Sequence, residues 1–207
     1  MDICSIIRRI ESRLMGFAPD ILTSLSGPVN TTDLDRLKHL MNMELPGDFL
    51  SLYQWHNGID PSKISNFFFG FQFSPLRKAI EILESNSLFF EFGKYRYLAP
   101  EIDASKREVE KRIVIGDDSY RCFIVVDLVP SKAGTVGQVI FLDIENQVAF
   151  LVSSSVTELL AKFAQDLEAG LYGLHGDALE EGVCFLDPAQ SIDIGNWYNY
   201  EKWSGLV

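Results

Sequence analysis

The hydrophobic positions in the first 85 residues follow the spacing of amphipathic helices. Between residues 3 and 14, apolar residues recur every three or four positions, which predicts a helix. A polar segment over 23–32 follows and is expected to be a loop. Thr32 stands three residues before Asp35, so we expect it to cap a second helix. Pro75 is expected to begin a further helix. The apolar stripes of these three helices are Ile3, Ile6, Ile7, Ile10 and Leu14; Leu34, Leu37, Leu40 and Met41; and Leu76, Ala79, Ile80 and Leu83.

The pattern changes to that of β-strands in two places. Between residues 66 and 73, phenylalanine stands at every second position, which predicts a strand with a bulge at Gly70. Farther along, four short β-rich runs alternate with turn residues, and we expect an antiparallel meander in which Cys122 is buried. A serine-rich cap at 153–155 then begins a last helix that ends at Gly170. The four runs are Ile113–Ile115, Cys122–Leu128, Gln138–Leu142 and Val148–Val152.

The run from Leu45 to Gly58 combines a start signal, an apolar face and a stop signal for a short helix. Pro46 suits a first helical turn because its missing N–H leaves no hydrogen bond unmade, and Asn57 with Gly58 tolerates the left-handed backbone that ends a helix. We expect His56 to pack on the core with a hydrogen bond to backbone, and Trp55 to point off that face toward a partner. The predicted face consists of Leu45, Phe49, Leu52, Tyr53 and His56.

This run resembles the signature of the SUKH superfamily, which includes the yeast cell-wall assembly regulator and carries a Leu-Pro, aromatic, apolar, His-Asn-Gly pattern. The second half of the chain is similar to the family as well, through the Ile115–Asp118 segment, the strand that ends at Asp127, and the serine-capped helix before Gly170. The residues that carry the resemblance as a structural signature are Leu45, Pro46, Phe49, His56, Asn57, Gly58, Gly137 and Gly170.

The resemblance implies an α+β fold in which a strongly bent, mainly antiparallel sheet is backed by helices. The periodicity predicts the same class independently. We expect an N-terminal helix and loop over 1–30, a SUKH-like domain over 31–170, and an acidic, aromatic extension over 171–207 that packs on the domain. Many relatives place a tryptophan before the Ile-Gly-Asp strand, whereas this chain has Lys111 and Arg112, so its partner-facing surface is expected to differ.

Composition and charge narrow the class of protein. The 207 residues are 47% hydrophobic and 12% aromatic, as expected of a folded domain with one core. The formal net charge of −11 opposes binding to nucleic acid and favours a basic protein partner. The N-terminal pattern does not predict a signal peptide, and the longest uncharged stretch is too short to span a membrane. We therefore expect a cytoplasmic protein with no membrane contact, in an oligomeric state that the sequence leaves open.

The residues that could carry chemistry have simpler interpretations. Asp117 and Asp118 are adjacent in a predicted turn, where their carboxylates are expected to bond local N–H groups. Asp127 lies near a strand end and would join them in a carboxylate cluster for a hard cation if the hairpin aligned that way. His56 and Asn57 are neighbours whose side chains project in different directions, unlike a catalytic pair. We predict no catalytic residue, no metal site and no cofactor.

The resemblance implies a binding module without catalytic residues, because bacterial relatives are associated with immunity against secreted toxins, which they bind directly. The leading hypothesis is an immunity-type protein that neutralises a cognate toxin, and the acidic balance suits a basic toxin domain. Two alternatives stay open, a regulatory scaffold of the cell-wall assembly regulator type and a metal-dependent hydrolase that uses Asp117, Asp118 and Asp127. The predicted partner-binding residues are Trp55, Asp117, Asp118, Asp127, Trp197 and Trp203.

Overall fold

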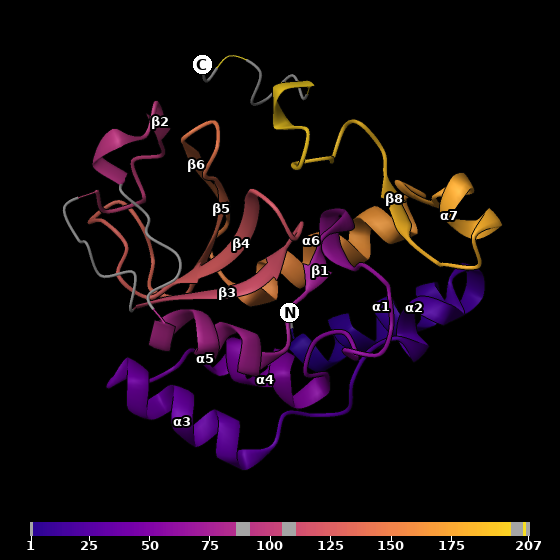
Figure 1. Ribbon diagram of the computed structural model, residues 1–207, viewed down its shortest axis with the longest axis horizontal. Coiled ribbons are helices and arrows are strands. Elements are labelled where there is room, and N and C mark those ends of the chain that lie inside the picture. Colours follow the sequence, from indigo (N-terminus) through magenta and orange to yellow (C-terminus); the bar gives the residue numbers. More distant parts are fainter. Residues whose placement is uncertain (1, 86–91, 105–110, 200–204, 206–207) are drawn as a thin grey trace.

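The fold is built around a six-stranded sheet with the strand order β1-β3-β4-β5-β6-β2 (Figure 1). The computed structural model describes residues 2–85, 92–104, 111–199 and 205. Neighbouring strands run antiparallel, except that β2 lies parallel to β6. The predicted α+β class with a mainly antiparallel sheet is therefore confirmed. The strands are β1 (Gln72–Phe73), β2 (Tyr97–Leu98), β3 (Arg112–Asp117), β4 (Cys122–Asp127), β5 (Gln138–Asp143) and β6 (Val148–Ser153).

The four central strands form the predicted meander. Each of β3, β4 and β5 is buried along its whole length, which explains why their sequences are continuous apolar runs rather than alternating ones. Cys122 is buried in β4, as expected, opposite Asp143 of β5. The register of β3 against β4 shifts between Val114 and Gly116, which is the mark of a β-bulge.

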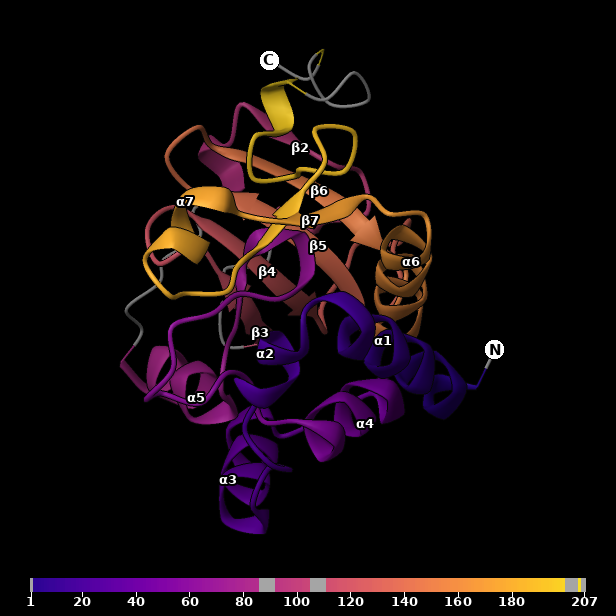
Figure 2. The same ribbon diagram turned by 90° about the vertical axis from the view of Figure 1, so that its right-hand side faces the viewer.

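Helices cover the sheet and each other. The last long helix, α6 (Val156–Glu168), begins with the Ser155 side chain accepting the N–H of Glu158, as the serine-rich cap predicts. It packs on β5 and β6, and α1 (Ile3–Phe17) packs on α6. Figure 2 shows α3 (Thr31–Met41) farthest from the sheet, beyond α5 (Leu76–Ser85), which it contacts. The other helices are α2 (Pro19–Thr23), α4 (Gly47–Trp55) and α7 (Gly176–Glu180).

Two details of the N-terminal region differ from the sequence-based expectation. The cap of α3 is Asn30 and not Thr32, because the Asn30 carboxamide oxygen accepts the N–H of Asp33 at 2.8 Å while Thr32 lies inside the helix. The short helix α2 is unpredicted, although Pro19 stands at its start, where proline is favoured. Over the described ranges, no helix has the length and hydropathy needed to cross a bilayer.

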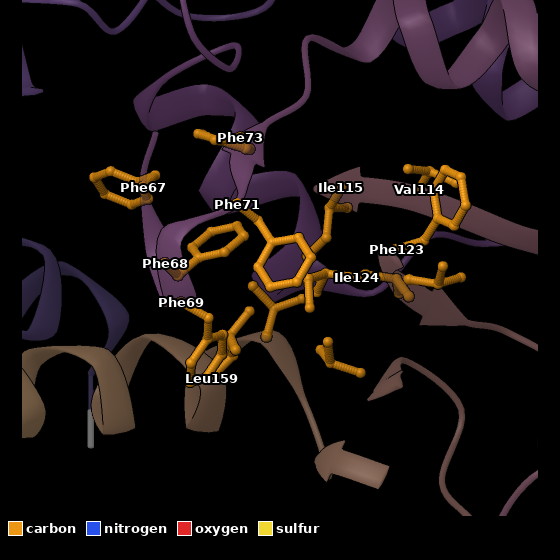
Figure 3. Packing of buried hydrophobic residues seen from close by; sticks show 14 of the residues in the cluster. Phe67, Phe68, Phe69, Phe71, Phe73, Val114, Ile115, Phe123, Ile124 and Leu159 are labelled. Carbon is orange, nitrogen blue, oxygen red and sulfur yellow. The ribbon is translucent and has the colours of Figure 1, made fainter. Parts of the chain in front are cut away.

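The phenylalanine run is a turn rather than the predicted strand. Phe68–Gly70 form a 3-10 turn (η1), in which Phe69 has a left-handed φ of 57°, and only Gln72–Phe73 join the sheet. The turn directs the phenylalanine rings into the core from several sides, so three consecutive rings, from Phe67 to Phe69, are buried without strand geometry (Figure 3). Phe67 packs on Phe163 of α6, with ring centroids 4.8 Å apart. The buried rings of the run are Phe67, Phe68, Phe69, Phe71 and Phe73.

The residues after α6 return to the same core. The strands β7 (Tyr172–Leu174) and β8 (Leu186–Pro188) form a two-stranded sheet. The Tyr172 hydroxyl accepts the N–H of Phe69 at 3.0 Å. Asn66 bonds to the backbone of Leu186 through both its carboxamide oxygen and its carboxamide nitrogen. These bonds attach the C-terminal segment to the phenylalanine turn. The 3-10 turns η2 (Phe92–Lys94) and η4 (Trp197–Asn199) complete the described elements.

Candidate functional site

The run from Leu45 to Gly58 connects three parts of the fold. The helix α4 ends at Trp55, and His56 has extended backbone, so the prediction that His56 lies on the helical face is wrong. Its Nδ1–H instead donates to the carbonyl oxygen of Ser26 at 2.5 Å, which confirms the expected bond to backbone and fixes the proton on Nδ1. The next residue caps the following helix, because the Asn57 carboxamide oxygen accepts the N–H of Leu76 at 2.9 Å. His56 and Asn57 thus hold loops and helices together.

The glycines of the signature mark close approaches of backbone. Gly58 has φ of 74°, and a Cβ placed on it would lie 2.4 Å from the nitrogen of Pro75. A Cβ on Gly137, in the loop between β4 and β5, would lie 2.8 Å from Cγ of Pro46. Pro46 at the start of the signature and Gly137, 91 residues later, are therefore in close contact, which explains physically why both residue types belong to one pattern.

Asp48 has a role that the sequence does not reveal. Its carboxylate accepts the N–H of Phe49 at 2.9 Å and that of Thr157 at 2.8 Å. The second bond caps the N-terminus of α6 from another helix, where a negative charge is favoured. In the same helix, the buried Tyr53 hydroxyl donates to the Ser74 carbonyl oxygen at 2.9 Å. The polar side chains of α4 thus fix its position against α6 and against Ser74, the residue after β1.

Trp55 is the last residue of α4 and is partly buried. Its indole N–H donates to Oε1 of Glu11 at 2.9 Å, and its ring lies 6.0 Å from that of Phe67. Trp55 therefore bonds two helices of the same chain, and its part in partner binding stays a prediction.

Asp117 and Asp118 form the turn that the sequence predicts. The Asp117 carboxylate accepts the N–H of Ser119 at 2.9 Å and also the ammonium of Lys78 at 2.8 Å. One oxygen of Asp118 accepts three backbone N–H groups, those of Tyr120, Arg121 and Cys122, at 2.8 to 2.9 Å. Asp118 is exposed, whereas Asp117 is 2% exposed. Both carboxylates hold the β3–β4 turn in one shape.

Asp127 lies at the opposite end of the same hairpin, so the expected carboxylate cluster is wrong. The register pairs Asp127 with Arg112 and pairs Asp117 with Phe123, and five residues of strand separate the two carboxylates by roughly 17 Å. Asp127 is fully buried and forms an ion pair with Arg112 at 3.2 Å. Within the described ranges, no three histidine, cysteine or acidic side chains gather as a metal site would require. The geometry therefore does not support a hydrolase built on these three residues.

Of the two C-terminal tryptophans, Trp197 lies among the described residues. Trp197 is 4% exposed, and its indole N–H donates to Oδ2 of Asp143 at 3.1 Å. The bond fixes η4 against the end of β5. Trp203 lies outside the described residues. Sequence reasoning assigns Trp197 to a partner, whereas its ring contributes to the interior and the next residue, Tyr198, is exposed.

An open groove of about 630 Å³ lies between the 57–63 loop and α5. Its lining includes three acidic and three basic side chains, and two of the basic ones lie next to a carboxylate. Lys78 bonds Asp117, and Arg77 lies 3.4 Å from Glu81. The groove therefore lacks a strong excess of either charge. Its charged residues are Asp33, Asp60, Glu81, Lys63, Arg77 and Lys78.

Three large apolar side chains stay exposed at the end of the sheet where the β3–β4 and β5–β6 turns lie. Tyr120 occupies the first turn, Ile144 the second, and Tyr198 the adjoining η4. Sequence reasoning misses them because Tyr120 and Ile144 look like ordinary members of turns between strands. The available signal is an apolar residue at a turn position, where polar residues are usual.

Comparison with known families agrees with this geometry. The model of the SMI1 / KNR4 family (SUKH-1) matches residues 28–162, which is well over half of the chain and includes the signature from Leu45 to Gly137. A comparison with curated proteins finds no match. The matched range covers the whole six-stranded sheet and the contacts among α4, α5 and Gly137 described above. The chain belongs to the SMI1 / KNR4 family (SUKH-1).

Proposed function

We propose that this protein is a non-enzymatic binding protein of the immunity type, which binds a cognate secreted toxin and neutralises it. The observation that carries the proposal is a domain of the SMI1 / KNR4 family on a strongly acidic chain. Neutralisation by binding requires a stable, specific surface and no catalytic residue, and the resemblance to bacterial immunity relatives supplies the biological precedent.

The charge of the chain indicates the kind of toxin. Asp and Glu number 29 against 18 Lys and Arg, which gives the formal net charge of −11. A toxin domain that acts on nucleic acid carries a basic surface, because it must neutralise phosphates. An acidic protein that covers such a surface gains a faster encounter and discriminates against acidic partners. A basic toxin domain, as in a nuclease, is therefore the proposed partner.

The proposal predicts that a reading frame next to this gene encodes a toxin, and the domain encoded there provides the test. Expression of that domain in a host cell should arrest growth, and co-expression of this protein should restore it. The purified pair, with the toxin inactivated in its catalytic site, should form a stoichiometric complex in isothermal titration calorimetry. Affinity should fall as salt is raised from 50 to 300 mM. Added salt shortens the Debye length and so screens the attraction between the acidic protein and the basic toxin domain.

Two outcomes would contradict the proposal. Unchanged toxicity during co-expression would remove the immunity role and favour a regulatory scaffold of the family type. A complex whose affinity is indifferent to salt would show that charge complementarity is not the basis of recognition. An unrelated acidic protein of similar size serves as the control for non-specific attraction.

A further inference from the structure

Three exposed apolar side chains form a small surface that the fold itself does not use. Tyr120 is 76% exposed, Tyr198 is 47% exposed and Ile144 is 37% exposed. They come from three segments that are far apart in the sequence: the β3–β4 turn, the β5–β6 turn and η4. We call these three residues, together with Arg121 at their centre, the docking face.

Arg121 holds the three segments of the docking face together. Its carbonyl oxygen accepts the N–H of Ile144 at 3.0 Å, which joins the two sheet turns. Its guanidinium lies 3.6 Å from the carboxylate of Glu145 and donates to the carbonyl oxygen of Gly195 at 3.5 Å, in the segment that leads to Tyr198. Tyr120 precedes Arg121 directly in the chain. The exposed side chains are therefore neighbours on one surface.

Aspartate carboxylates hold these segments in place by accepting hydrogen bonds from their N–H groups. Asp118 accepts three N–H groups of the Tyr120 turn. Asp143 accepts the backbone and side-chain N–H groups of Asn146, both at 2.8 Å, as well as the indole N–H of Trp197. Asp193 does the same for Asn196.

Asn196 extends this bracing to the docking face itself. Its carboxamide oxygen accepts the hydroxyl proton of Tyr198 at 2.9 Å. A surface whose turns are fixed in advance loses little conformational entropy when a partner binds. Because these hydrogen bonds fix the turns before binding, the exposed side chains are well suited to bind a partner.

Trp197 and Tyr198 are adjacent, but only the first has a structural role, because its ring is buried while that of Tyr198 is exposed. These neighbours differ more than tenfold in exposure, at 4% and 47%. The buried ring holds η4 on the sheet, while the exposed ring lies beside Arg121. Tyrosine at the centre of an exposed patch is typical of protein interfaces, because it offers a large area with few rotatable bonds.

We propose that the docking face is where this protein binds its partner, a folded protein domain with a basic surface. The inference rests on the proposed function and adds the place of contact. Carboxylates accompany the apolar side chains, since Asp118 and Glu145 lie in the two turns and Asp193 lies four residues before η4, so a cationic rim on the partner would complement them. A second copy of this chain is a poorer occupant, because it would bring two chains of net charge −11 together.

The test uses the full-length chain and the catalytically inactivated toxin domain from the neighbouring reading frame. The variants are Tyr120→Ser, Ile144→Ser and the two combined. Ile64→Ser is the matched control, because Ile64 is 70% exposed in the separate 62–65 segment. Backbone bonds of Tyr120 and Ile144 survive these changes, and circular dichroism with thermal melting checks the fold. The Kd is measured by isothermal titration calorimetry.

The expected result is a Kd about 30-fold weaker for Tyr120→Ser, a larger loss for the double variant, and wild-type affinity for Ile64→Ser. Hydrogen exchange in the complex should slow at the 118–122 and 144–147 turns. If the wild-type protein binds and the double variant binds equally well, the docking face is wrong while the proposed function stands. If the wild-type protein does not bind the toxin domain, both fail. A dimer in sedimentation that the double variant abolishes would instead assign the face to self-association.

Discussion

Arg112 and Asp127 face each other across β3 and β4 and form an ion pair with no exposed side-chain area on either residue. The Phe92 ring covers the guanidinium at 4.6 Å. The Gln138 carboxamide nitrogen, from the next strand in register, donates to the second oxygen of Asp127 at 3.1 Å. The N–H of Val129 donates to the first oxygen at 3.0 Å. One buried polar row thus crosses three strands and joins them to η2.

Removal of the Arg112 charge should destabilise the fold strongly. In Arg112→Met, the Asp127 carboxylate stays buried and loses its counter-ion, a situation that typically costs about 3–5 kcal/mol. The free energy of unfolding, measured by urea denaturation at pH 7, should fall by that amount.

The double variant Arg112→Met, Asp127→Asn is the control for this prediction. Asparagine keeps an acceptor for the N–H of Val129 and carries no charge, so the double variant should recover at least half of the lost stability. A double variant less stable than Arg112→Met would show that the methionine fails through packing rather than through an uncompensated charge.

The sequence does not predict the pair of Arg112 and Asp127, because the pair depends on the register of β3 against β4. Lys111 and Arg112 read as a departure from the family pattern, and Asp127 reads as a possible partner of Asp117. The shift between Val114 and Gly116 and the four-residue turn decide which residues become opposite. Neither the bulge nor the alignment of β5 can be read from a β-rich run alone. Strand existence is a local property, whereas strand register is a tertiary one.

Local signals explain the parts that sequence does predict. The helix α6 has its serine cap and apolar stripe within one segment, and the four meander strands are bounded by turn residues. The phenylalanine run misleads because burial on every side needs no strand period, and Phe69 adopts a left-handed backbone that its residue type disfavours. The docking face is missed for a related reason: exposure of Tyr120 depends on what the surrounding segments leave uncovered.

Buried tyrosines should make the fold unstable in alkali. Burial raises the pKa of Tyr53 and Tyr172 well above the ordinary value, and burial with the nearby Asp143 carboxylate does so for Tyr95. The unfolded chain releases these protons from about pH 10, whereas the folded chain keeps them. The unfolded state then binds fewer protons, so the free energy of unfolding falls as the pH rises. Absorbance at 295 nm should show these phenols ionising together with the loss of far-ultraviolet ellipticity.

Tyr53→Phe is the matched variant for the alkaline transition. It removes one buried phenol and leaves the Ser74 carbonyl without its donor, which should cost about 1 kcal/mol at pH 7. The absorbance change that accompanies unfolding should decrease by one tyrosine. Ionisation of all seven tyrosines before any loss of ellipticity would contradict the assignment of these phenols to the folded interior.

Alanine at Gly58 and at Gly170 distinguishes the cost of a left-handed backbone from the cost of a steric overlap. Both have φ near 70°, at 74° and 71°. A Cβ on Gly58 would lie 2.4 Å from the nitrogen of Pro75, whereas nothing lies within 4 Å of a Cβ on Gly170. Gly170→Ala should therefore cost about 1 kcal/mol in urea denaturation, from backbone strain alone. Gly58→Ala adds a backbone overlap and should cost about 3–5 kcal/mol. Equal losses would mean that the loop before α5 moves freely away from the 56–58 segment.

Trp197 and Trp55 form a second matched pair, because each donates its indole N–H to a carboxylate. The acceptor of Trp197 is the fully buried Asp143, and that of Trp55 is the partly buried Glu11. Hydrogen bonds to charge contribute more where water is excluded, so Trp197→Phe should cost about 3 kcal/mol and Trp55→Phe about 1 kcal/mol in urea denaturation. Similar costs would show that the Asp143 bond contributes no more than the partly buried bond of Trp55 to Glu11. Since Trp197 also holds the segment that presents Tyr198, its variant should exchange the backbone hydrogens of 195–199 faster than wild type, while Trp55→Phe should leave them unchanged.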